Sequence, residues 1–248
     1  MFRTLSMALI TLCLLAGSAF AAAEKTVVFA SDATWPPMEL LDNKKQVVGY
    51  SADYVNAVAK ELNMPVEVRN VAWDGIFAGL AAGNYDAVAS SVTITPERQK
   101  QFLFTTPYAE IHQALVVPAN SPLKNMAELK GKKVGGQIGT TGIFVMQNAK
   151  TGAVIREYED VGLAMEDLAN ARIDAVMCDG PVAQYYANKN KDFTNKFKLA
   201  LTTPDAEYYG FALNKKDTAL QTRLNKGIKA VQEKGIEKQL QQKWFGQN

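Results

Sequence analysis

Apolar residues recur along the chain at two spacings, one typical of strands and one typical of helices. Short apolar runs at 25–31 ("KTVVFAS") and 64–71 ("MPVEVRNV") predict strands. The segment between them, 51–64, predicts an amphipathic helix whose apolar face consists of Val55, Val58, Ala59 and Leu62. Strands that alternate with helices in this way predict a mostly parallel sheet in an α/β lobe.

The alternation continues along the chain and then starts again. A helix is predicted at 73–83 and a strand at 85–95, after which Pro96 opens another helix. Residues 131–147 then predict a strand, a glycine-rich turn and a helix. Residues 161–186 predict a helix, a strand, a turn and a further helix. The repeated order of elements indicates two similar α/β lobes.

Two extended segments connect these halves. They are "YAEIHQALVV" (108–117) and "EYYGFALNK" (207–215), and two amphipathic segments follow the second one. No spacer rich in Ser, Gly or Pro separates the halves. We therefore expect two lobes joined by two crossing strands, with a cleft between the lobes and a natural hinge. Lobe 1 is expected at 24–110 and 207–248, and lobe 2 at 111–206.

The N-terminus has the pattern of a secretory signal. Arg3 supplies a positive charge, and residues 5–17 are apolar but too short for a typical membrane span. Small residues at Ala19 and Ala21 form a cleavage site, so we predict a signal peptide at 1–21. The alternative is an uncleaved anchor.

Composition and charge narrow the functions of the mature chain. Hydrophobic residues make up 48% and charged residues 21%, which is typical of a globular protein. Without Arg3 the chain has 26 basic residues (27 minus 1) and 25 acidic ones, a balance that predicts no nucleic-acid partner. One histidine and Cys178, the only cysteine after residue 21, cannot form a usual zinc site or an internal disulfide.

The stretch "TITPER" places a cation at an unfavourable position. Thr95 and Pro96 predict the N-cap and the first residue of a helix, so Arg98 lies in its first turn. The positive end of the helix dipole disfavours a cation there. An anion shared by the guanidinium and free N–H groups would explain this placement, since arginine binds carboxylates with two hydrogen bonds. A solvated arginine, or one paired with Glu97 or another surface acid, explains it equally well.

A second anion site is possible in "GQIGTTG" (136–142). Its glycines flank Thr140 and Thr141 just before a predicted helix, where backbone N–H groups and hydroxyls are available to an anion. The spacing matches neither the dinucleotide fingerprint nor a Walker A loop. A plain strand-to-helix turn has the same sequence pattern.

Three further residues are candidates with equally ordinary alternatives. Asp179 follows a predicted strand, where its carboxylate either accepts a cationic group or caps the helix that begins near Pro181. Trp35 and Trp73 each adjoin a turn, where they either form an aromatic wall for a ligand or pack in the core.

Taken together, these blocks resemble the periplasmic polar amino-acid-binding proteins of ABC importers. The blocks occur in the order typical of that family: "GYSADYVNAVAKEL", "DGIFAGLAAGNYDAVASSVTITPER" and the terminal "KWFG". The chain is similar to the glutamine-binding and the lysine/arginine/ornithine-binding members. The resemblance covers the whole mature chain. It implies a two-lobed periplasmic binding protein fold in the α/β class, in which each lobe has a mostly parallel sheet with flanking helices and two crossing strands form the hinge.

The resemblance also implies the function. Such a protein captures a polar or basic L-amino acid (glutamine, arginine or lysine) in the interlobe cleft of a periplasmic monomer. It then delivers the amino acid to a membrane permease, without a cofactor, a metal or catalysis. The ligand's α-carboxylate would bind Arg98, helped by N–H and hydroxyl groups of Thr140 and Thr141.

The remaining site residues follow from the same resemblance. Asp179 would hold the α-ammonium with the Ser91 carbonyl and the Thr93 hydroxyl, and Trp35 and Trp73 would sandwich the side chain.

Departures from the glutamine-binding pattern concern the far end of the site. Asp32 would face that end of the ligand. Gln137 stands where glutamine binders often have lysine, and Cys178 where they have histidine. Without that lysine the site tolerates a cation beside Asp32, so glutamine, arginine and lysine all stay open. Asp32 would repel a second carboxylate, which disfavours acidic amino acids.

An enzyme on the same fold is the alternative, similar to secreted cyclohexadienyl or arogenate dehydratases. Such chemistry needs a positioned general acid in the cleft. Glu110 and His112 have alternate spacing on a crossing strand and could share a face. A hinge strand with polar outward residues accounts for them better, so we expect no enzymatic activity.

Overall fold

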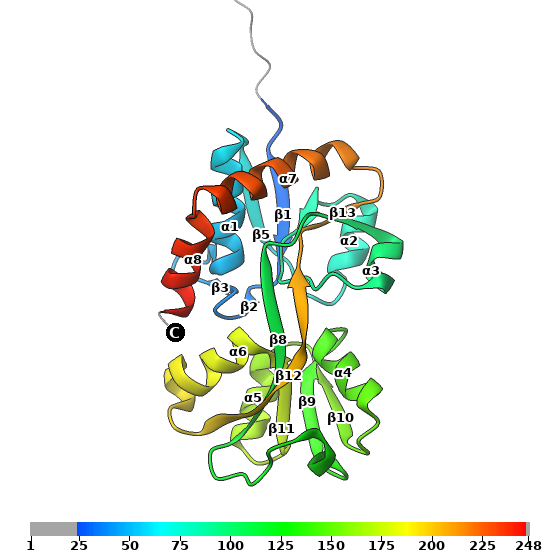
Figure 1. The fold of residues 1–248 in the computed structure, drawn as a ribbon, viewed down its shortest axis with the longest axis vertical. Helices are drawn as coiled ribbons and strands as arrows, with labels where there is room; N and C mark the ends of the chain where they lie inside the picture. The colour runs from blue at the N-terminus through cyan, green and yellow to red at the C-terminus, as the bar shows by residue number, and fades with distance from the viewer. Residues whose placement is uncertain (1–23, 247–248) are drawn as a thin grey trace, which may run out of the picture.

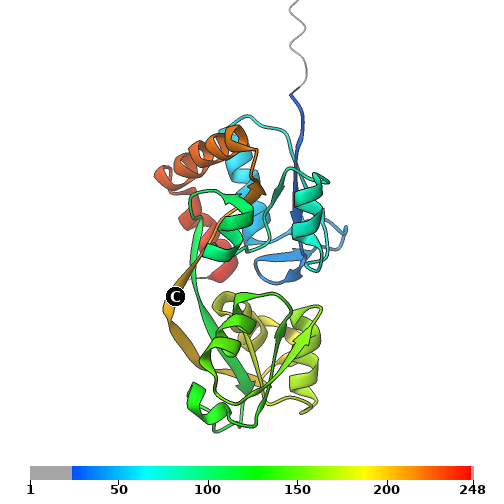
Figure 2. The ribbon, with the colours of Figure 1, turned by 90° about the vertical axis from the view of Figure 1, so that its right-hand side faces the viewer.

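A computed structural model describes residues 24–246 of the chain and shows two lobes stacked along the long axis (Figure 1). The predicted signal peptide at 1–21 lies outside the described residues. Two long strands, β8 (Ala109–Pro118) and β12 (Phe197–Tyr209), run side by side from one lobe to the other, as Figure 2 shows from the side. Among residues 24–246, no helix is both long and apolar enough to cross a membrane.

Lobe 1 contains a five-stranded sheet. Its strand order is β5 (Val66–Asn70), β1 (Val27–Ser31), β6 (Ala87–Val88), β13 (Ala212–Asn214) and β7 (Phe102–Phe104). β1 is parallel to both of its neighbours, whereas β13 is antiparallel to both of its own. Four of the five strands therefore run in one direction.

Helices cover both faces of this sheet. They are α1 (Tyr50–Glu61), α2 (Ile76–Ala82), α3 (Pro96–Gln101), α7 (Thr218–Glu233) and α8 (Ile236–Phe245). The predicted apolar face of α1 packs in the core, with Val55 and Val58 each 1% exposed. Gly227 lets α7 approach α1 closely, because a Cβ there would lie 2.7 Å from a Val58 methyl group.

A small antiparallel sheet that was not predicted follows β1. It consists of β2 (Thr34–Trp35), β3 (Glu39–Leu41) and β4 (Val47–Val48). This sheet lies in lobe 1 on the side that faces lobe 2 (Figure 1). It therefore places Trp35 and Glu39 close to the junction of the lobes.

Lobe 2 repeats the plan of lobe 1. Its sheet has the order β10 (Val154–Tyr158), β9 (Lys133–Gln137), β11 (Ala175–Asp179), β8 and β12, and only β8 runs against the other four. Three α-helices flank it, α4 (Thr141–Ala149), α5 (Val161–Ala169) and α6 (Gly180–Gln184). Shorter turns are η1 (Met126–Leu129), η2 (Tyr185–Lys189) and η3 (Lys191–Phe193).

The two-lobed α/β fold with mostly parallel strands and two crossing strands is confirmed, and two predicted elements differ. The strand predicted at 85–95 is β6 alone, because the chain turns at Ser91, which has a positive φ of 47°. The second crossing strand ends at Tyr209 rather than spanning 207–215, because β13 already belongs to the sheet of lobe 1. Its start at Phe197 was missed, since its register is interrupted by shifts within the polar run before Glu207.

The predicted lobe boundaries fall on paired residues of the two crossing strands. Ile111 pairs with Glu207 and His112 pairs with Ala206. The boundaries at 110/111 and 206/207 stay a prediction, because a hinge is defined by a motion.

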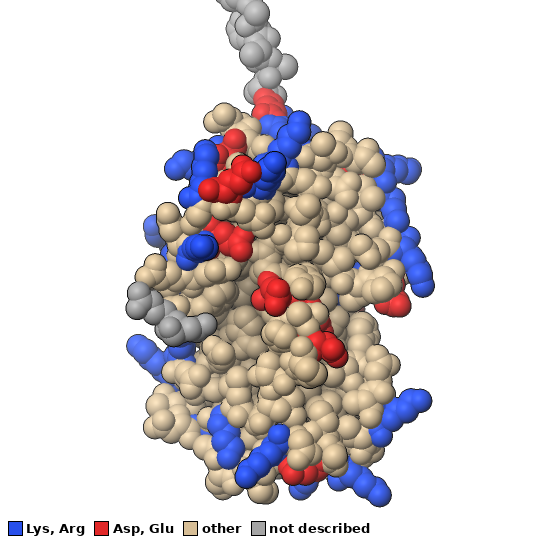
Figure 3. All heavy atoms as spheres, in the orientation of Figure 1, with Lys and Arg blue, Asp and Glu red and all other residues tan. Residues whose placement is uncertain are grey.

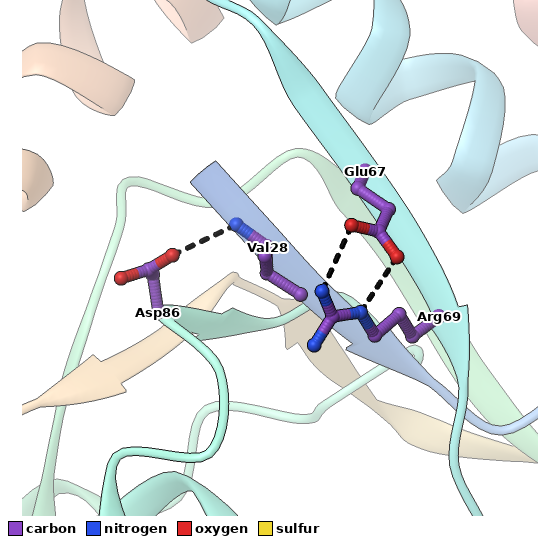
Figure 4. Close-up of polar contacts among 4 residues, drawn as sticks. All are labelled: Val28, Glu67, Arg69 and Asp86. Atoms are coloured by element: carbon purple, nitrogen blue, oxygen red, sulfur yellow. Dashed lines mark hydrogen bonds and ion pairs between the residues drawn. The ribbon is translucent and has the colours of Figure 1, made fainter. Parts of the chain in front are cut away.

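An ion pair in lobe 1 gives a useful reference for the site. Arg69 on β5 donates to both carboxylate oxygens of Glu67 on the same strand, at 2.6 and 2.9 Å (Figure 4). Nearby, the Asp86 carboxylate accepts from the backbone N–H of Val28 at 2.8 Å and fixes the turn before β6 against β1 (Figure 4). Arg69 thus has the carboxylate partner that is usual for an arginine.

Candidate functional site

A small cavity of about 20 Å³ lies between the lobes. It is lined by residues that follow or end strands, including Asp32 after β1, Gln137 at the end of β9 and Asp179 at the end of β11. Ligand sites of open α/β sheets lie outside the carboxyl ends of the strands. All ten predicted site residues line this cavity, together with Ser90: Asp32, Trp35, Trp73, Ser91, Thr93, Arg98, Gln137, Thr140, Thr141 and Asp179.

The lobes are closed over this cavity. Among the hydrogen bonds that cross from one lobe to the other, four lie at this cavity and join these atoms: Trp35 Nε1 to Asp179 Oδ2 at 3.1 Å, Trp73 Nε1 to the Ile138 carbonyl at 3.0 Å, Arg98 Nη2 to the Gly139 carbonyl at 3.1 Å and Gln137 Nε2 to Asp32 Oδ2 at 3.0 Å. The Thr93 and Thr141 hydroxyls also meet across the cleft, and Lys189 Nζ of lobe 2 donates to the Trp244 and Phe245 carbonyls of lobe 1 away from the cavity. On the face that carries the crossing strands, acidic side chains are exposed where the lobes meet, and lysines and arginines lie mainly toward the outer parts of both lobes (Figure 3).

Arg98 projects from the start of α3. Thr95 caps this helix, since its Oγ1 accepts from the Arg98 N–H at 3.2 Å, so the predicted N-cap is confirmed. The guanidinium donates to the carbonyls of Thr93 (2.9 Å) and Gly139 (3.1 Å) and lies 5.5 Å from the centre of the Trp73 ring. Burial lowers the pKa of Arg98 to about 10, which leaves it charged at neutral pH.

Arg98 has no carboxylate partner of the kind that Arg69 has. Within residues 24–246, none of the ion pairs includes Arg98. The alternative of a pair with Glu97 is therefore not realised. Asp179 and Glu207 raise the pKa of Arg98 from a distance, without contacting it as an ion pair. A partly buried cation without a carboxylate in direct contact is unfavourable, so an anion beside the guanidinium would stabilise it.

The turn before α4 provides donors for the same anion. Gly139 has a φ of +70°, which allows the sharp turn that brings the start of α4 to the cavity. Thr140 stands at the N-cap position, but its hydroxyl donates to the Gln137 carbonyl at 2.7 Å instead of capping the helix. The first-turn N–H groups of α4 have no helical partners and carry partial positive charge. This end of α4 is therefore electrostatically favourable for an anion, as Arg98 is.

The threonine hydroxyls differ from the prediction in their partners. The Thr141 hydroxyl donates to Glu207 Oε2 at 2.6 Å, and the Thr140 hydroxyl is bound to Gln137. In this structure both hydroxyl protons are used within the protein, which leaves backbone N–H groups and Arg98 as the free donors for a carboxylate.

Asp179 is a buried acceptor and not a helix cap. It occupies the N-cap position of α6, yet its side chain makes no capping hydrogen bond. Its carboxylate accepts from Trp35 Nε1 (3.1 Å), from the Tyr209 hydroxyl and from Gln113 Nε2. Burial raises the pKa of Asp179 to about 6, with its side chain 4% exposed. An ammonium group from a ligand would offset this cost of ionisation.

Asp32 is the second buried carboxylate of the cavity, and it is 5% exposed. It accepts from the hydroxyl and N–H of Thr34 (2.9 and 3.2 Å), from the Trp73 N–H (3.2 Å) and from Gln137 Nε2 (3.0 Å). Burial raises its pKa, although these hydrogen bonds act in the opposite direction. Gln137 also donates to the Glu159 carbonyl at 2.9 Å, so its amide is held in place.

The two tryptophans contribute to the cavity wall in different ways. Trp35 is 6% exposed and also packs in the core, so both interpretations of its role apply. Trp73 is partly exposed and packs edge-on against Phe77, with ring centres 5.2 Å apart. Both indole N–H groups bond to the opposite lobe, so the ring planes are fixed in the closed arrangement.

Besides Ser90, four residues that contact the site were missed by sequence reasoning. Glu39 on β3 is fully buried and accepts from the Ser91 hydroxyl at 2.8 and 3.1 Å. Burial raises the pKa of Glu39 well above its usual value, which favours its neutral form. The others are Gln113, Glu207 and Tyr209 of the crossing strands. The lone amide of Gln113 within the apolar run "IHQALVV" was the one available signal.

The fold and the cavity together define a two-lobed binding protein with a closed interlobe site. A family model described as "Bacterial extracellular solute-binding proteins, family 3" matches residues 27–247, so the chain belongs to this family.

Individual relatives agree with this assignment. The chain is 32% identical over 247 residues to the ABC transporter arginine-binding protein 1 of Escherichia coli, covering 96% of this chain and 99% of the relative. Among solved structures it is similar to the arginine-, lysine-, histidine-binding protein ArtJ of Geobacillus stearothermophilus, with a TM-score of 0.84 and 33% identity over 90% of this chain and 96% of that one. An ancestral arginine-binding protein bound to arginine gives a TM-score of 0.83 and 34% identity, covering 89% of this chain and 98% of that one.

Proposed function

We propose that the protein captures a free L-amino acid with a cationic side chain in the interlobe cavity. The observation that carries this proposal is the number of charged groups in the lining. Arg98, Asp32 and Asp179 line the cavity, and within residues 24–246 none of them has an ion-pair partner. A basic amino acid carries one carboxylate and two cations, so it matches all three.

Each ligand charge then has one binding group. The α-carboxylate binds Arg98 and the N–H groups at the start of α4, which share it as a charge-assisted pair. The α-ammonium binds Asp179, beside the acceptor oxygens of Ser91 and Thr93. The apolar stem lies against Trp35 and Trp73, and the terminal cation binds Asp32.

Glutamine is the second-ranked ligand. Its amide can donate to Asp32, but it leaves the buried carboxylate of Asp32 without a counter-charge. Gln137, which already donates to Asp32 at 3.0 Å, is neutral and does not supply that charge. Relatives named for arginine, lysine and histidine support a basic ligand, and a similar ancestral arginine-binding protein bound to glutamine supports glutamine as the second ligand.

The same proposal places the protein outside the cytoplasm. Its predicted signal peptide at 1–21 would direct it to the periplasm, where it would work as a monomer that delivers its ligand to the permease of an ABC importer. Relatives named as ABC transporter binding proteins support this role and a function without catalysis.

A thermal-shift screen of the refolded mature protein against the twenty amino acids and ornithine tests the proposal. Refolding removes any co-purified ligand. A ligand at about 100 times its Kd stabilises by about 2.7 kcal/mol, which at roughly 2–4 °C per kcal/mol raises Tm by roughly 5–10 °C. We expect shifts for arginine and lysine, and smaller ones for glutamine.

Matched variants assign the shift to the cavity. Arg98→Ala should lose it, whereas Arg69→Ala, which removes the surface ion pair with Glu67, should keep it. A flat response to every amino acid, together with turnover of prephenate or arogenate, would contradict the proposal in favour of the dehydratase.

A further inference from the structure

The carboxylate of Glu207 joins both lobes and both crossing strands. Glu207 lies on β12, and its Oε2 accepts from the Thr93 hydroxyl of lobe 1 at 3.1 Å and from the Thr141 hydroxyl of lobe 2 at 2.6 Å. The same oxygen accepts from Gln113 Nε2 of β8 at 3.2 Å. A single oxygen atom therefore has one partner in each lobe and one on the other hinge strand.

This contact depends on closure of the lobes. The hydroxyl oxygens of Thr93 and Thr141 are 3.3 Å apart across the cleft. Movement about two crossing strands separates groups of opposite lobes, so in an open arrangement one carboxylate oxygen cannot keep both hydroxyls. The three-way contact at Glu207 is therefore specific to the closed arrangement.

Glu207 acts behind the cavity wall. Thr93 and Thr141 line the cavity, whereas Glu207 and Gln113 are not among its lining residues. Both hydroxyls donate to Glu207, so they use their single protons there. They then present only lone pairs toward the cavity, which suits an ammonium group and not a carboxylate.

Gln113 extends the contact to Asp179. Its side-chain nitrogen has two N–H groups, which are shared by three oxygens within hydrogen-bond distance: Asp179 Oδ1, Thr141 Oγ1 at 3.1 Å and Glu207 Oε2 at 3.2 Å. The residue is fully buried, and its Oε1 has no hydrogen-bond partner within residues 24–246. These three oxygens orient the amide, which connects the proposed ammonium-binding carboxylate to the crossing strands.

We propose that Glu207 is a positioning residue that couples closure of the lobes to capture of the ligand. It favours the closed arrangement by bonding to both lobes at once, and it orients two cavity hydroxyls as acceptors. The orientation of the two hydroxyls toward a ligand rests on the proposed amino-acid-binding function. The effect of Glu207 on closure does not, because it does not require a ligand.

Calorimetric titration with arginine tests the coupling between lobe closure and ligand capture in two variants of Glu207 and one control variant. Glu207→Ala removes the acceptor, and we expect a loss of affinity of about tenfold or more, as for a lost hydrogen bond to a charged group. Glu207→Gln keeps one acceptor oxygen and should lose less. Glu110→Gln makes the same chemical change at an exposed position of β8 and should bind like the wild type.

A distance measurement gives a readout that a purely structural role would not change. Spin labels at the exposed positions Lys60 of α1 and Glu166 of α5 report the separation of the lobes by pulsed EPR. Cys178 is buried, so labels attach at the introduced cysteines. We expect Glu207→Ala to lower the closed fraction, both without ligand and at each arginine concentration, and Glu207→Gln to restore part of it.

The outcomes separate this inference from the proposed function. If the wild type binds arginine and Glu207→Ala closes and binds equally well or better, the inference is wrong and the proposed function stands. If the wild type binds no amino acid, the proposed function is wrong, and the closed fraction of the ligand-free variants still decides whether Glu207 favours closure. In the double variant Thr93→Val/Thr141→Val, Glu207→Ala should have no further effect on closure, and an undiminished effect would contradict the contact.

Discussion

Asp32 and Asp179 are two carboxylates on one cavity, and they differ in what holds them. Within the described part of the chain, Asp179 of lobe 2 accepts only from side chains of lobe 1 and the crossing strands, namely Trp35, Tyr209 and Gln113. Asp32 of lobe 1 accepts mostly from its own neighbourhood, and a single amide of lobe 2 reaches it.

This difference predicts two different contributions to ligand binding, one shared by all amino acids and one selective for the ligand side chain. The partners of Asp179 belong to the crossing strands and to the opposite lobe, so its orientation is part of the closed architecture, and under the proposed function it would serve any amino acid. The donors to Asp32 come mostly from residues of its own lobe, and under the same proposal a change there would affect one kind of ligand side chain. Substitutions at the two positions should therefore give different ligand profiles.

The largest effect is expected from Asp179→Asn. The amide keeps the shape of the side chain but leaves the ammonium of every ligand unpaired, and truncating one member of a buried charge pair costs about 2–5 kcal/mol. We expect the affinity for arginine, lysine and glutamine to fall by at least roughly 30-fold, the lower end of that range. Calorimetric titration measures this loss.

A stability measurement separates lost binding from lost folding. Because burial raises the pKa of Asp179 to about 6, ionisation of this group at pH 7 stabilises the folded protein less than the unfolded chain. The ligand-free Asp179→Asn variant should therefore be at least as heat-stable as the wild type at that pH. Asp192→Asn, at an exposed position of lobe 2, should change neither property. If Asp179→Asn bound all three amino acids within threefold of the wild-type affinity, Asp179 would not be a ligand-binding residue.

A smaller and selective effect is expected from Asp32→Asn. Loss of the counter-charge should weaken arginine and lysine by roughly 10- to 30-fold, about 1.4–2 kcal/mol. Glutamine should lose less than about threefold, because an asparagine still accepts a hydrogen bond from its amide. Affinities for the three ligands measured on the same preparation give the comparison, and equal losses for all three would show that Asp32 does not read the ligand side chain.

The sequence alone predicted the local features of this site well. The N-cap at Thr95 and the helix start at Pro96 depend on neighbouring residues, so pattern reasoning found them. The alternation of strands and helices likewise predicted two α/β lobes. The residue patterns also found six of the ten cavity residues as candidates, each beside an ordinary alternative. The resemblance to a family added Asp32, Ser91, Thr93 and Gln137, and it favoured the binding role for all ten.

Long-range partners were the part that could not be predicted. Asp179 has the sequence pattern of a helix cap, and only the distant Trp35 and Tyr209 show that its carboxylate turns into the cavity instead. Glu39 and Glu207 have no local pattern, because their partners come from other elements. The interrupted register of β12 hid the start of the second crossing strand for the same reason, since a strand with bulges lacks regular alternation.

The smallest expected effect is the pH dependence, and it sharpens the comparison of the two aspartates. An ammonium binds the ionised form of Asp179, whose pKa burial raises to about 6. Affinity should therefore be nearly constant above pH 7 and fall on acidification, by about tenfold between pH 7 and pH 5 for a single group of this pKa. The ligand-free stability contributed by this group should have the opposite sign. A folded pKa above the ordinary value favours the folded state below about pH 4, and this contribution is lost as the pH rises through about 6.

Glutamine and arginine should differ in this titration. Burial also raises the pKa of Asp32, so a ligand that needs both carboxylates ionised should lose more affinity on acidification than one that needs Asp179 alone. Arginine should therefore show the steeper fall in wild type, and Asp32→Asn should reduce its pH profile to that of glutamine. Calorimetric titrations at pH 5, 6 and 7 measure both profiles. Parallel profiles for the two ligands in the wild type would contradict the assignment of the α-ammonium to Asp179 and of the side-chain cation to Asp32. The selectivity of the cavity would then have to come from its shape.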